Sequence, residues 1–288
     1  MAEANFVPPA QLSKNLVNVG VAKANLTPVK MIVLGILAGV FIGFAAHLAT
    51  TVATGWTIGG TAALFGLKKF FVGAVFSCGL MLVIIPGSEL WTGNNLMGVA
   101  LLEKKITIGQ MMKNWVLVYL GNLIGSIFLA WIIARSSGLL DGAVGATAIK
   151  IASGKVSAQI SGIGHNYGYF FRAIGCNWLV CLAVMMALAS KDIAGKVLGI
   201  FFPIMAFVTS GFEHAIANMY FIPAGIFAKA FPAAATASGL EAGALANLNW
   251  VSMWTQNLIT VTLGNLVGGT ILTAGVYWFL YVKGSQES

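Results

Sequence analysis

A glycine-flanked segment that carries a glutamate occurs twice inside long apolar runs of this chain. Residues Gly87–Asn94 read Gly-Ser-Glu-Leu-Trp-Thr-Gly-Asn, and residues Gly211–Asn218 read Gly-Phe-Glu-His-Ala-Ile-Ala-Asn. Only 8% of the chain is charged and 58% is hydrophobic, whereas soluble domains carry roughly 25% charge. The chain is therefore a membrane protein with several spans. The matching placement of the two glutamates indicates two interruptions of membrane helices that meet to form a transport path.

The two runs that contain these segments are too long for one straight crossing. The run Phe70–Leu102 would extend about 50 Å as a single helix at 1.5 Å per residue, but the hydrocarbon core is only about 30 Å thick. We expect it to break at Pro86-Gly87 and Gly93-Asn94, and a short second half to start near Asn94–Asn95. The run Val197–Ala230 repeats the anomaly, with a break at Gly211–Asn218 and a half-helix starting between His214 and Asn218.

Four further apolar segments bring the prediction to six transmembrane helices in an all-α fold. They cover about Met31–Ala53, Met111–Ala134, Phe170–Ala189 and Asn257–Val282. We expect a cytoplasmic N-terminal arm (1–30), a six-span transport domain (31–283, with halves 31–135 and 170–283) and a tail (284–288). The arm is an interfacial helix or a lid beneath the pore, and residues 136–169 and 231–254 are connections. A small excess of Lys on the side of the termini favours an N-inside orientation in the plasma membrane.

A second internal match indicates how the halves are related. Both the third and the sixth span contain Asn-x6-Gly-Asn-Leu-x-Gly, at Asn114–Gly125 and Asn257–Gly268. Three spans per half is an odd number, so the halves insert in opposite senses as a 3+3 inverted repeat, with broken helices 2 and 5 and the site at the midplane. The exposed N–H groups at the start of each half-helix would attract an anion. Asn122 and Asn265 are expected to hydrogen-bond between helices.

Other classes of function fit the sequence less well. The net charge of +8 lies at segment ends rather than in a patch, which argues against nucleic acid as a partner. The three cysteines lie in apolar segments and are interpreted as packing residues. Because no cluster of metal ligands or nucleophiles stands out, we expect neither an enzyme nor a bound metal or cofactor. A water or glycerol channel stays open as an alternative, although the sequence has no paired Asn-Pro-Ala.

Several motifs together resemble the formate/nitrite transporter family over about residues 12–283. They are the two glutamate segments, Tyr119–Asn122 (Tyr-Leu-Gly-Asn) and Cys176–Ala183 (Cys-Asn-Trp-Leu-Val-Cys-Leu-Ala). The resemblance implies an aquaporin-like fold, a homopentamer with one pore per subunit, and transport of a small monovalent anion with or without a proton. Formate is favoured among the anions, and hydrosulfide and nitrite stay open.

The resemblance also assigns roles to single residues. It implies that His214 is the central pore histidine and that Thr92 faces it. The implied pore constrictions are Phe76, Leu80, Leu90, Trp91, Val180 and Phe207. The implied loop-anchoring residues are Glu89, Glu213, Asn94, Asn177 and Asn218. Where the family usually has a vestibule lysine this chain has Ser161, and Lys155, with Lys150 behind it, is the candidate replacement.

These roles suggest a mechanism. A charge at the centre of a bilayer costs at least roughly 2.5–3.5 kcal/mol on insertion scales. Protonating the anion removes most of that cost, and His214, acting through Thr92 or a water, is the candidate proton donor. A buried histidine is more often a satisfied core residue, but the helix break, Glu213 and Thr92 favour a functional role here. Glu89 and Glu213 would repel an anion, so we interpret them as structural anchors.

Overall fold

The computed structural model describes residues 6–56, 64–157, 159–160 and 163–284, and most of these residues are helical. The first half contains α1 (Pro9–Ala24), α2 (Pro28–Ala53), α3 (Phe65–Phe76), α4 (Cys78–Ile84), α5 (Trp91–Asn94), η1 (Asn95–Met97), α6 (Gly98–Leu102), α7 (Ile108–Trp131) and η2 (Ile132–Ser136). The α8 helix (Ala143–Lys155) and a short antiparallel hairpin, β1 (Gln159–Ile160) with β2 (Ile163–Gly164), follow.

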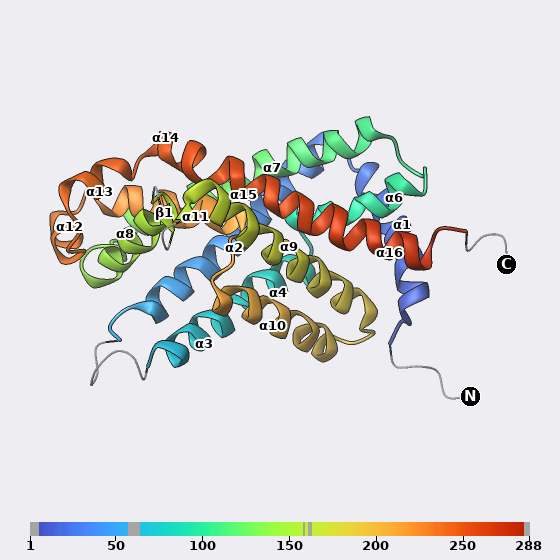
Figure 1. The fold of residues 1–288 in the computed structure, drawn as a ribbon, viewed down its shortest axis with the longest axis horizontal. Helices are drawn as coiled ribbons and strands as arrows, with labels where there is room; N and C mark the ends of the chain where they lie inside the picture. The colour runs from blue at the N-terminus through green and yellow to red at the C-terminus, as the bar shows by residue number, and fades with distance from the viewer. Residues whose placement is uncertain (1–5, 57–63, 158, 161–162, 285–288) are drawn as a thin grey trace.

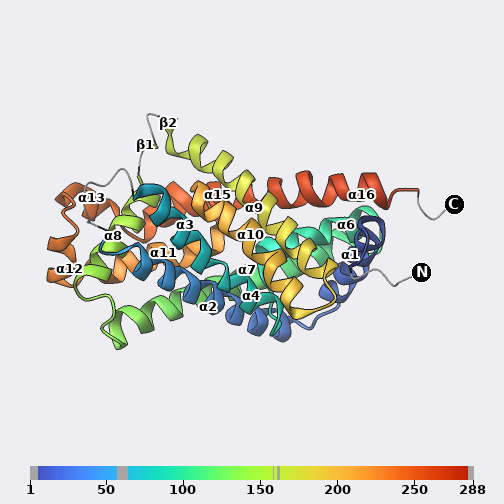
Figure 2. The same ribbon diagram turned by 90° about the horizontal axis from the view of Figure 1, so that it is seen from below.

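The second half starts with α9 (His165–Ala189), α10 (Ile193–Ser210) and α11 (Ala215–Ala228). Two short helices, α12 (Pro232–Ala237) and α13 (Ala242–Asn247), precede a continuous helical run of α14 (Trp250–Met253), η3 (Trp254–Leu258), α15 (Ile259–Leu266), η4 (Val267–Gly275) and α16 (Val276–Tyr281). In Figures 1 and 2 the described ends of the chain lie at one end of the molecule and α8, α12 and α13 lie at the other.

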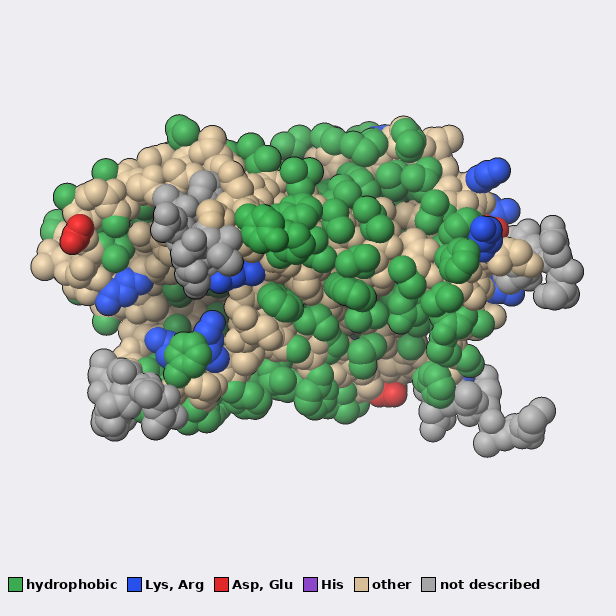
Figure 3. Space-filling model, viewed as in Figure 1, with side chains coloured by type: hydrophobic (Ala, Val, Ile, Leu, Met, Phe, Trp, Pro, Cys, Tyr) green, Lys and Arg blue, Asp and Glu red, His purple; other side chains and the backbone are tan. Residues whose placement is uncertain are grey.

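Six helical segments among the described residues are long and apolar enough to cross a membrane. They are Pro28–Ala53, Phe65–Ile84, Ile108–Ser136, Asn166–Ala189, Ile193–Ser210 and Trp250–Tyr281. Figure 3 shows hydrophobic side chains over the middle of the visible face and Lys and Arg side chains mainly near its two ends. Such a belt is what a bilayer requires of the surface it surrounds.

Two expected connections contain helices. Residues 136–169 connect the third and fourth candidate spans as expected, and α8 lies within them. The surface loop expected at 231–254 instead holds the helices α12, α13 and α14. These segments are rich in alanine, which has the highest helix propensity. Ala148, Ala234 and Leu248 are buried, so packing against the rest of the molecule stabilises the helices. The N-terminal arm likewise contributes Leu12 and Leu16 of α1 to the core.

Glycines set the close spacing between α2 and α7. A Cβ added at Gly121 of α7 would lie 2.6 Å from the carbonyl oxygen of Ile32, and one at Gly35 of α2 would lie 3.0 Å from that of Val118. Small residues at these positions let two backbones approach, and no side chain could fit without moving a helix. Ser126 uses this proximity to donate to the carbonyl of Gly39 at 3.2 Å.

This packing gives a direct stability prediction. Gly121→Ala should lower the free energy of unfolding by about 1–3 kcal/mol, because the methyl group overpacks the α2–α7 contact. Gly109→Ala in the first turns of the same helix is the matched control, since a Cβ there meets only the Thr107 hydroxyl at 3.9 Å and alanine favours helix. Thermal unfolding in detergent measures both. Equal melting temperatures for the two variants would contradict the close-packing argument.

Candidate functional site

Two non-helical segments interrupt the helices at the places where the sequence has its glutamate motifs. In the first, the helix ends at Ile84 and a new one begins at Trp91, while in the second the helix ends at Ser210 and the next begins at Ala215. Gly87 (φ +95°) and Gly211 (φ +79°) adopt positive φ angles that favour glycine. Leu90 and His214 then take the same extended conformation, with φ/ψ of −106°/121° and −111°/117°.

The start of the first half-helix differs from the prediction. It begins at Trp91 rather than near Asn94–Asn95, so Gly93 and Asn94 are helical. The Asn94 amide was taken as a signal of a turn, but it makes tertiary contacts. It donates to Glu89 Oε2 at 2.7 Å and to Asn114 Oδ1 at 2.8 Å. Because these partners satisfy the side chain, the asparagine is free to sit inside a helix. The second half-helix begins within the predicted range.

Each glutamate anchors a network of hydrogen bonds, and the two networks consist of the same types of residue in the same arrangement. Lys23 contacts Glu89 at 2.6 Å, and Lys155 contacts Glu213 at 2.9 Å. An asparagine in each half-helix, Asn94 or Asn218, donates to its glutamate at 2.7 Å and to a further asparagine, Asn114 or Asn257, at 2.8 Å. These last asparagines donate back to the carbonyls of Lys23 and Lys155. Both carboxylates therefore have partners within the protein.

A second pair of asparagines holds the backbone of each break. Asn122 Nδ2 donates to the carbonyls of Gly35 and Glu89, and its Oδ1 accepts from Trp91 N at 2.9 Å. Asn265 makes the same three contacts with Ala173, Glu213 and Ala215. The expectation that Asn122 and Asn265 hydrogen-bond between helices is confirmed. Such bonds are needed because water cannot satisfy the broken backbone at membrane depth.

His214 lies between the two breaks. Its Nδ1 accepts a hydrogen bond from Ala217 N at 3.0 Å and so caps α11. With Nδ1 as acceptor, the neutral ring carries its proton on Nε2, and this N–H donates to Thr92 Oγ1 at 3.0 Å. The imidazole stacks on Phe207 with ring centroids 5.8 Å apart. Nearby, Asn177 of α9 donates to the Thr92 carbonyl at 3.3 Å, to Asn95 and to the Asn265 carbonyl.

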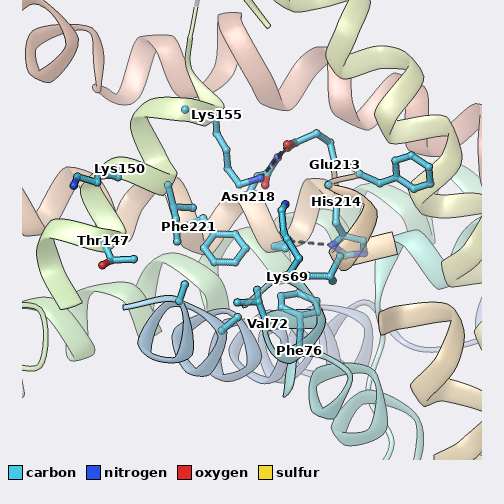
Figure 4. Close-up of a pocket in the computed structure, with 18 of the residues that line it drawn as sticks. Lys69, Val72, Phe76, Thr147, Lys150, Lys155, Glu213, His214, Asn218 and Phe221 are labelled. Atoms are coloured by element: carbon cyan, nitrogen blue, oxygen red, sulfur yellow. Dashed lines mark hydrogen bonds and ion pairs between the residues drawn. The ribbon is translucent and has the colours of Figure 1, made fainter. Parts of the chain in front are cut away.

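A cavity of about 850 Å³ leads to His214 from the end of the molecule that holds α8. Its charged lining residues are Lys68, Lys69, Lys150, Lys155, Arg172 and Glu213. Figure 4 shows Lys155 joined to Glu213 by dashed lines and Lys69 extending from α3 toward them, whereas Lys150 lies apart from both. We call this cavity the vestibule, and both Lys155 and Lys150 line it.

The residues expected to form constrictions are all buried but do not all line this cavity. Phe76 and Phe207 line it and meet edge to face at 5.9 Å. Trp91 packs edge-on against Trp115 and Tyr119 of α7, at 6.2 and 5.4 Å. The remaining three, which are buried outside the cavity lining, are Leu80, Leu90 and Val180.

The sequence-based prediction of site residues does not include Lys23, Lys68, Lys69 or Arg172. Lys23 lies in the predicted N-terminal arm, and Arg172 lies near the start of the predicted fourth span. A usable signal for Lys23 was available, because a lysine precedes the first span of each half at the end of a helix, Lys23 in α1 and Lys155 in α8. The α9 helix begins at His165, earlier than the expected Phe170, and Arg172 in this helix lines the cavity.

Comparison with known proteins places this chain among membrane transporters. The family described as formate/nitrite transporter matches residues 10–279. A probable formate transporter of Methanothermobacter thermautotrophicus is 42% identical over 97% of this chain and 98% of that protein. The formate channel FocA of Escherichia coli (strain K12) is 36% identical over 96% of this chain and 94% of its own.

Solved structures agree in fold. A structure described as a pentameric formate channel with formate bound superposes with a TM-score of 0.76 and 35% identity, covering 89% of this chain and 98% of the other. An ion channel of the same family superposes with a TM-score of 0.78 and 28% identity, covering 93% and 98%.

Proposed function

This chain belongs to the formate/nitrite transporter family, and we propose that it is a membrane channel that carries formate as its main cargo. It is a multi-pass transporter rather than an enzyme. The observation that carries the proposal is the meeting of Thr92 and His214, which come from the two helix breaks and lie 3.0 Å apart at the bottom of a basic vestibule.

The path is proposed to run from the vestibule past Phe76, Leu80 and Phe207 to His214, and then past Leu90, Trp91 and Val180. Buried apolar and aromatic rings resist a bare anion because they offer it no hydrogen bonds. The two half-helices starting at Trp91 and Ala215 offset part of this cost, since each has a partial positive charge at its start, although Asn122 and Asn265 already accept the N–H of its first residue.

The His214–Thr92 pair supplies the polar contact in the middle of this path. The Nε2–H donates to the Thr92 oxygen, which leaves the Thr92 hydroxyl proton free to point at an anion. A proton relay through the same pair needs a second proton to reach Nδ1 from the vestibule, and that proton would displace the Ala217 N–H that Nδ1 now accepts. We therefore propose that His214 acts first as a hydrogen-bond donor through Thr92 and transfers a proton only when this cap opens.

The two halves are proposed to form an inverted repeat, with helices 2 and 5 broken, in a homopentamer with one pore per subunit. The matching networks around Glu89 and Glu213 support the repeat, and the pentameric relative supports the assembly. The arm of residues 1–30 serves the transport domain 31–283 by contributing Lys23 to the first network. Both termini are proposed to be cytoplasmic, with the chain in the plasma membrane surrounded by lipid.

Uptake into proteoliposomes tests the cargo. We expect formate to enter faster than nitrite, hydrosulfide or lactate, and its uptake to rise as the external pH falls because protons become more available at the path. The measurement uses labelled or pH-indicated uptake of each anion at two pH values, with empty vesicles as control. Fast osmotic swelling in water or glycerol without anion uptake would reject an anion channel, and faster nitrite or hydrosulfide uptake would reassign the cargo within the family.

A further inference from the structure

Two cations of the vestibule break the symmetry between the halves. Lys69 precedes Glu89 by the same number of residues as Ile193 precedes Glu213, so Lys69 corresponds to Ile193 in the second half. The backbone N–H of Glu89 donates to the Leu34 carbonyl, and that of Glu213 donates to the Arg172 carbonyl, so Arg172 corresponds to Leu34. The glutamate networks are present on both sides, whereas Lys69 and Arg172 have apolar counterparts. These two cations are therefore not part of the hydrogen-bond networks that hold both helix breaks.

Lys69 and Arg172 also differ from Lys155 in their charge balance. The Lys155 ammonium contacts both oxygens of Glu213, at 2.9 and 3.2 Å, so the pair is nearly neutral. Within the described part of the chain the two salt bridges are Lys23–Glu89 and Lys155–Glu213, and neither includes Lys69 or Arg172. Lys69 and Arg172 thus present net positive charge to the cavity that they line.

The position of Lys69 ties this charge to the pore. Its Nζ lies 3.6 Å from the point that a Cβ on Gly211 would occupy, at the start of the break that carries Glu213 and His214. Lys69 is only partly buried and interacts electrostatically with Arg172, Lys155 and Glu213. Arg172 is also partly buried, and its own carbonyl holds the Glu213 N–H. The Lys69 ammonium therefore lies next to the loop that leads to His214, and Arg172 contacts the same loop through its backbone and lines the same cavity.

We infer that Lys69 and Arg172 form an anion-binding station in the vestibule, which holds a small monocarboxylate before it reaches His214. The planar guanidinium of Arg172 suits a carboxylate through two parallel N–H donors, and Lys69 adds a compact charge. The station raises the local concentration of anion at one mouth of the pore only, because the opposite side has Ile193 and Leu34. That the held anion is formate rests on the proposed function; the presence of an anion station does not.

The transport test separates capture from passage. For Lys69→Gln combined with Arg172→Gln we expect an about tenfold higher KM for formate, at the low end of the roughly 10- to 10³-fold effect of electrostatic steering, with maximal uptake within about twofold of the parent. Lowering the ionic strength to about 0.01 M, where the Debye length is about 30 Å, should speed subsaturating uptake by the parent but not by the double variant. Arg172→Lys should recover part of the loss, and Lys105→Gln, at an exposed lysine that does not line the vestibule, should behave like the parent.

A labelling test does not depend on transport. In a Lys69→Cys, Cys78→Ser chain, an anionic thiol reagent should modify Cys at position 69 several-fold faster than a cationic reagent of equal size, and Arg172→Gln should remove the preference. The native Cys176 and Cys181 are fully buried, and the same chain with Lys69 retained controls for their reaction. Equal rates with both reagents, or an unchanged KM in a double variant that elutes like the parent, would overturn the station. If the Lys69→Cys, Cys78→Ser chain labels as expected but the parent carries no formate, only the proposed cargo is refuted.

Discussion

Replacing His214 with phenylalanine should lower maximal formate uptake by about 10- to 100-fold. A hydrogen bond that acts on a charged group contributes about 1.5–3 kcal/mol, and 1.4 kcal/mol is tenfold in rate or affinity. Phenylalanine keeps the stack on Phe207 but loses the Nε2–H that polarises Thr92, so the anion would meet an apolar surface at the middle of the path. Initial rates of uptake in proteoliposomes measure the effect.

Two variants separate the role of His214 as a helix cap from its role in transport. The ring also caps α11 through Nδ1, and losing a cap costs about 1 kcal/mol of stability, so elution as an intact oligomer must be checked for each protein. His214→Asn retains a good capping residue and should fold as well as the parent while still losing rate. Thr92→Val removes the hydroxyl with little change of shape and should slow uptake in the same way. If His214→Phe carried formate at the parental rate and with the parental pH profile, the role assigned to this pair would be wrong.

The helix breaks could be predicted because they depend on local chemistry. A glycine at positive φ, a glutamate and an extended residue recur at the same spacing, and each local choice follows from the sequence itself. The six spans likewise follow from apolar length. The start of the first half-helix could not be placed in this way, because Asn94 has the local preferences of a turn residue while its actual partners, Glu89 and Asn114, are contributed by the fold.

The partners of the two glutamates lay beyond what spacing alone can indicate. Lys23 meets Glu89 because α1 packs near the first break, and Lys155 meets Glu213 because the connection between the third and fourth spans forms the helix α8. Weak amphipathic patterns in both segments gave little sign of packing. The inference that Lys69 and Arg172 have no cationic counterparts in the other half required the backbone contacts of Glu89 and Glu213, which align the two halves.

The Lys155–Glu213 pair should show a strong rescue effect. Glu213→Ala alone should destabilise the protein by about 3–5 kcal/mol, because it leaves the ammonium of Lys155 without its partner in a poorly solvated site. The side chains of Lys155 and Glu213 are only 16% and 8% exposed, and Glu213 also holds the Asn218 amide at 2.7 Å. Lys155→Met combined with Glu213→Gln should recover much of this loss, since neither charge is then stranded and the Gln side-chain oxygen can still accept from Asn218.

The same double variant distinguishes a structural role of the Lys155–Glu213 pair from a direct role in anion transport. If the pair is an anchor, Lys155→Met with Glu213→Gln should restore both thermal stability in detergent and most of the formate uptake that the single variants lose. Lys23→Met with Glu89→Gln should behave alike on the opposite side, and Lys105→Met, at an exposed lysine, serves as the control. Single variants within about 1 kcal/mol of the parent would mark an ordinary surface pair. Restored stability without restored uptake would instead make the charge of Lys155 part of the anion path, because only the transport step would then still miss it.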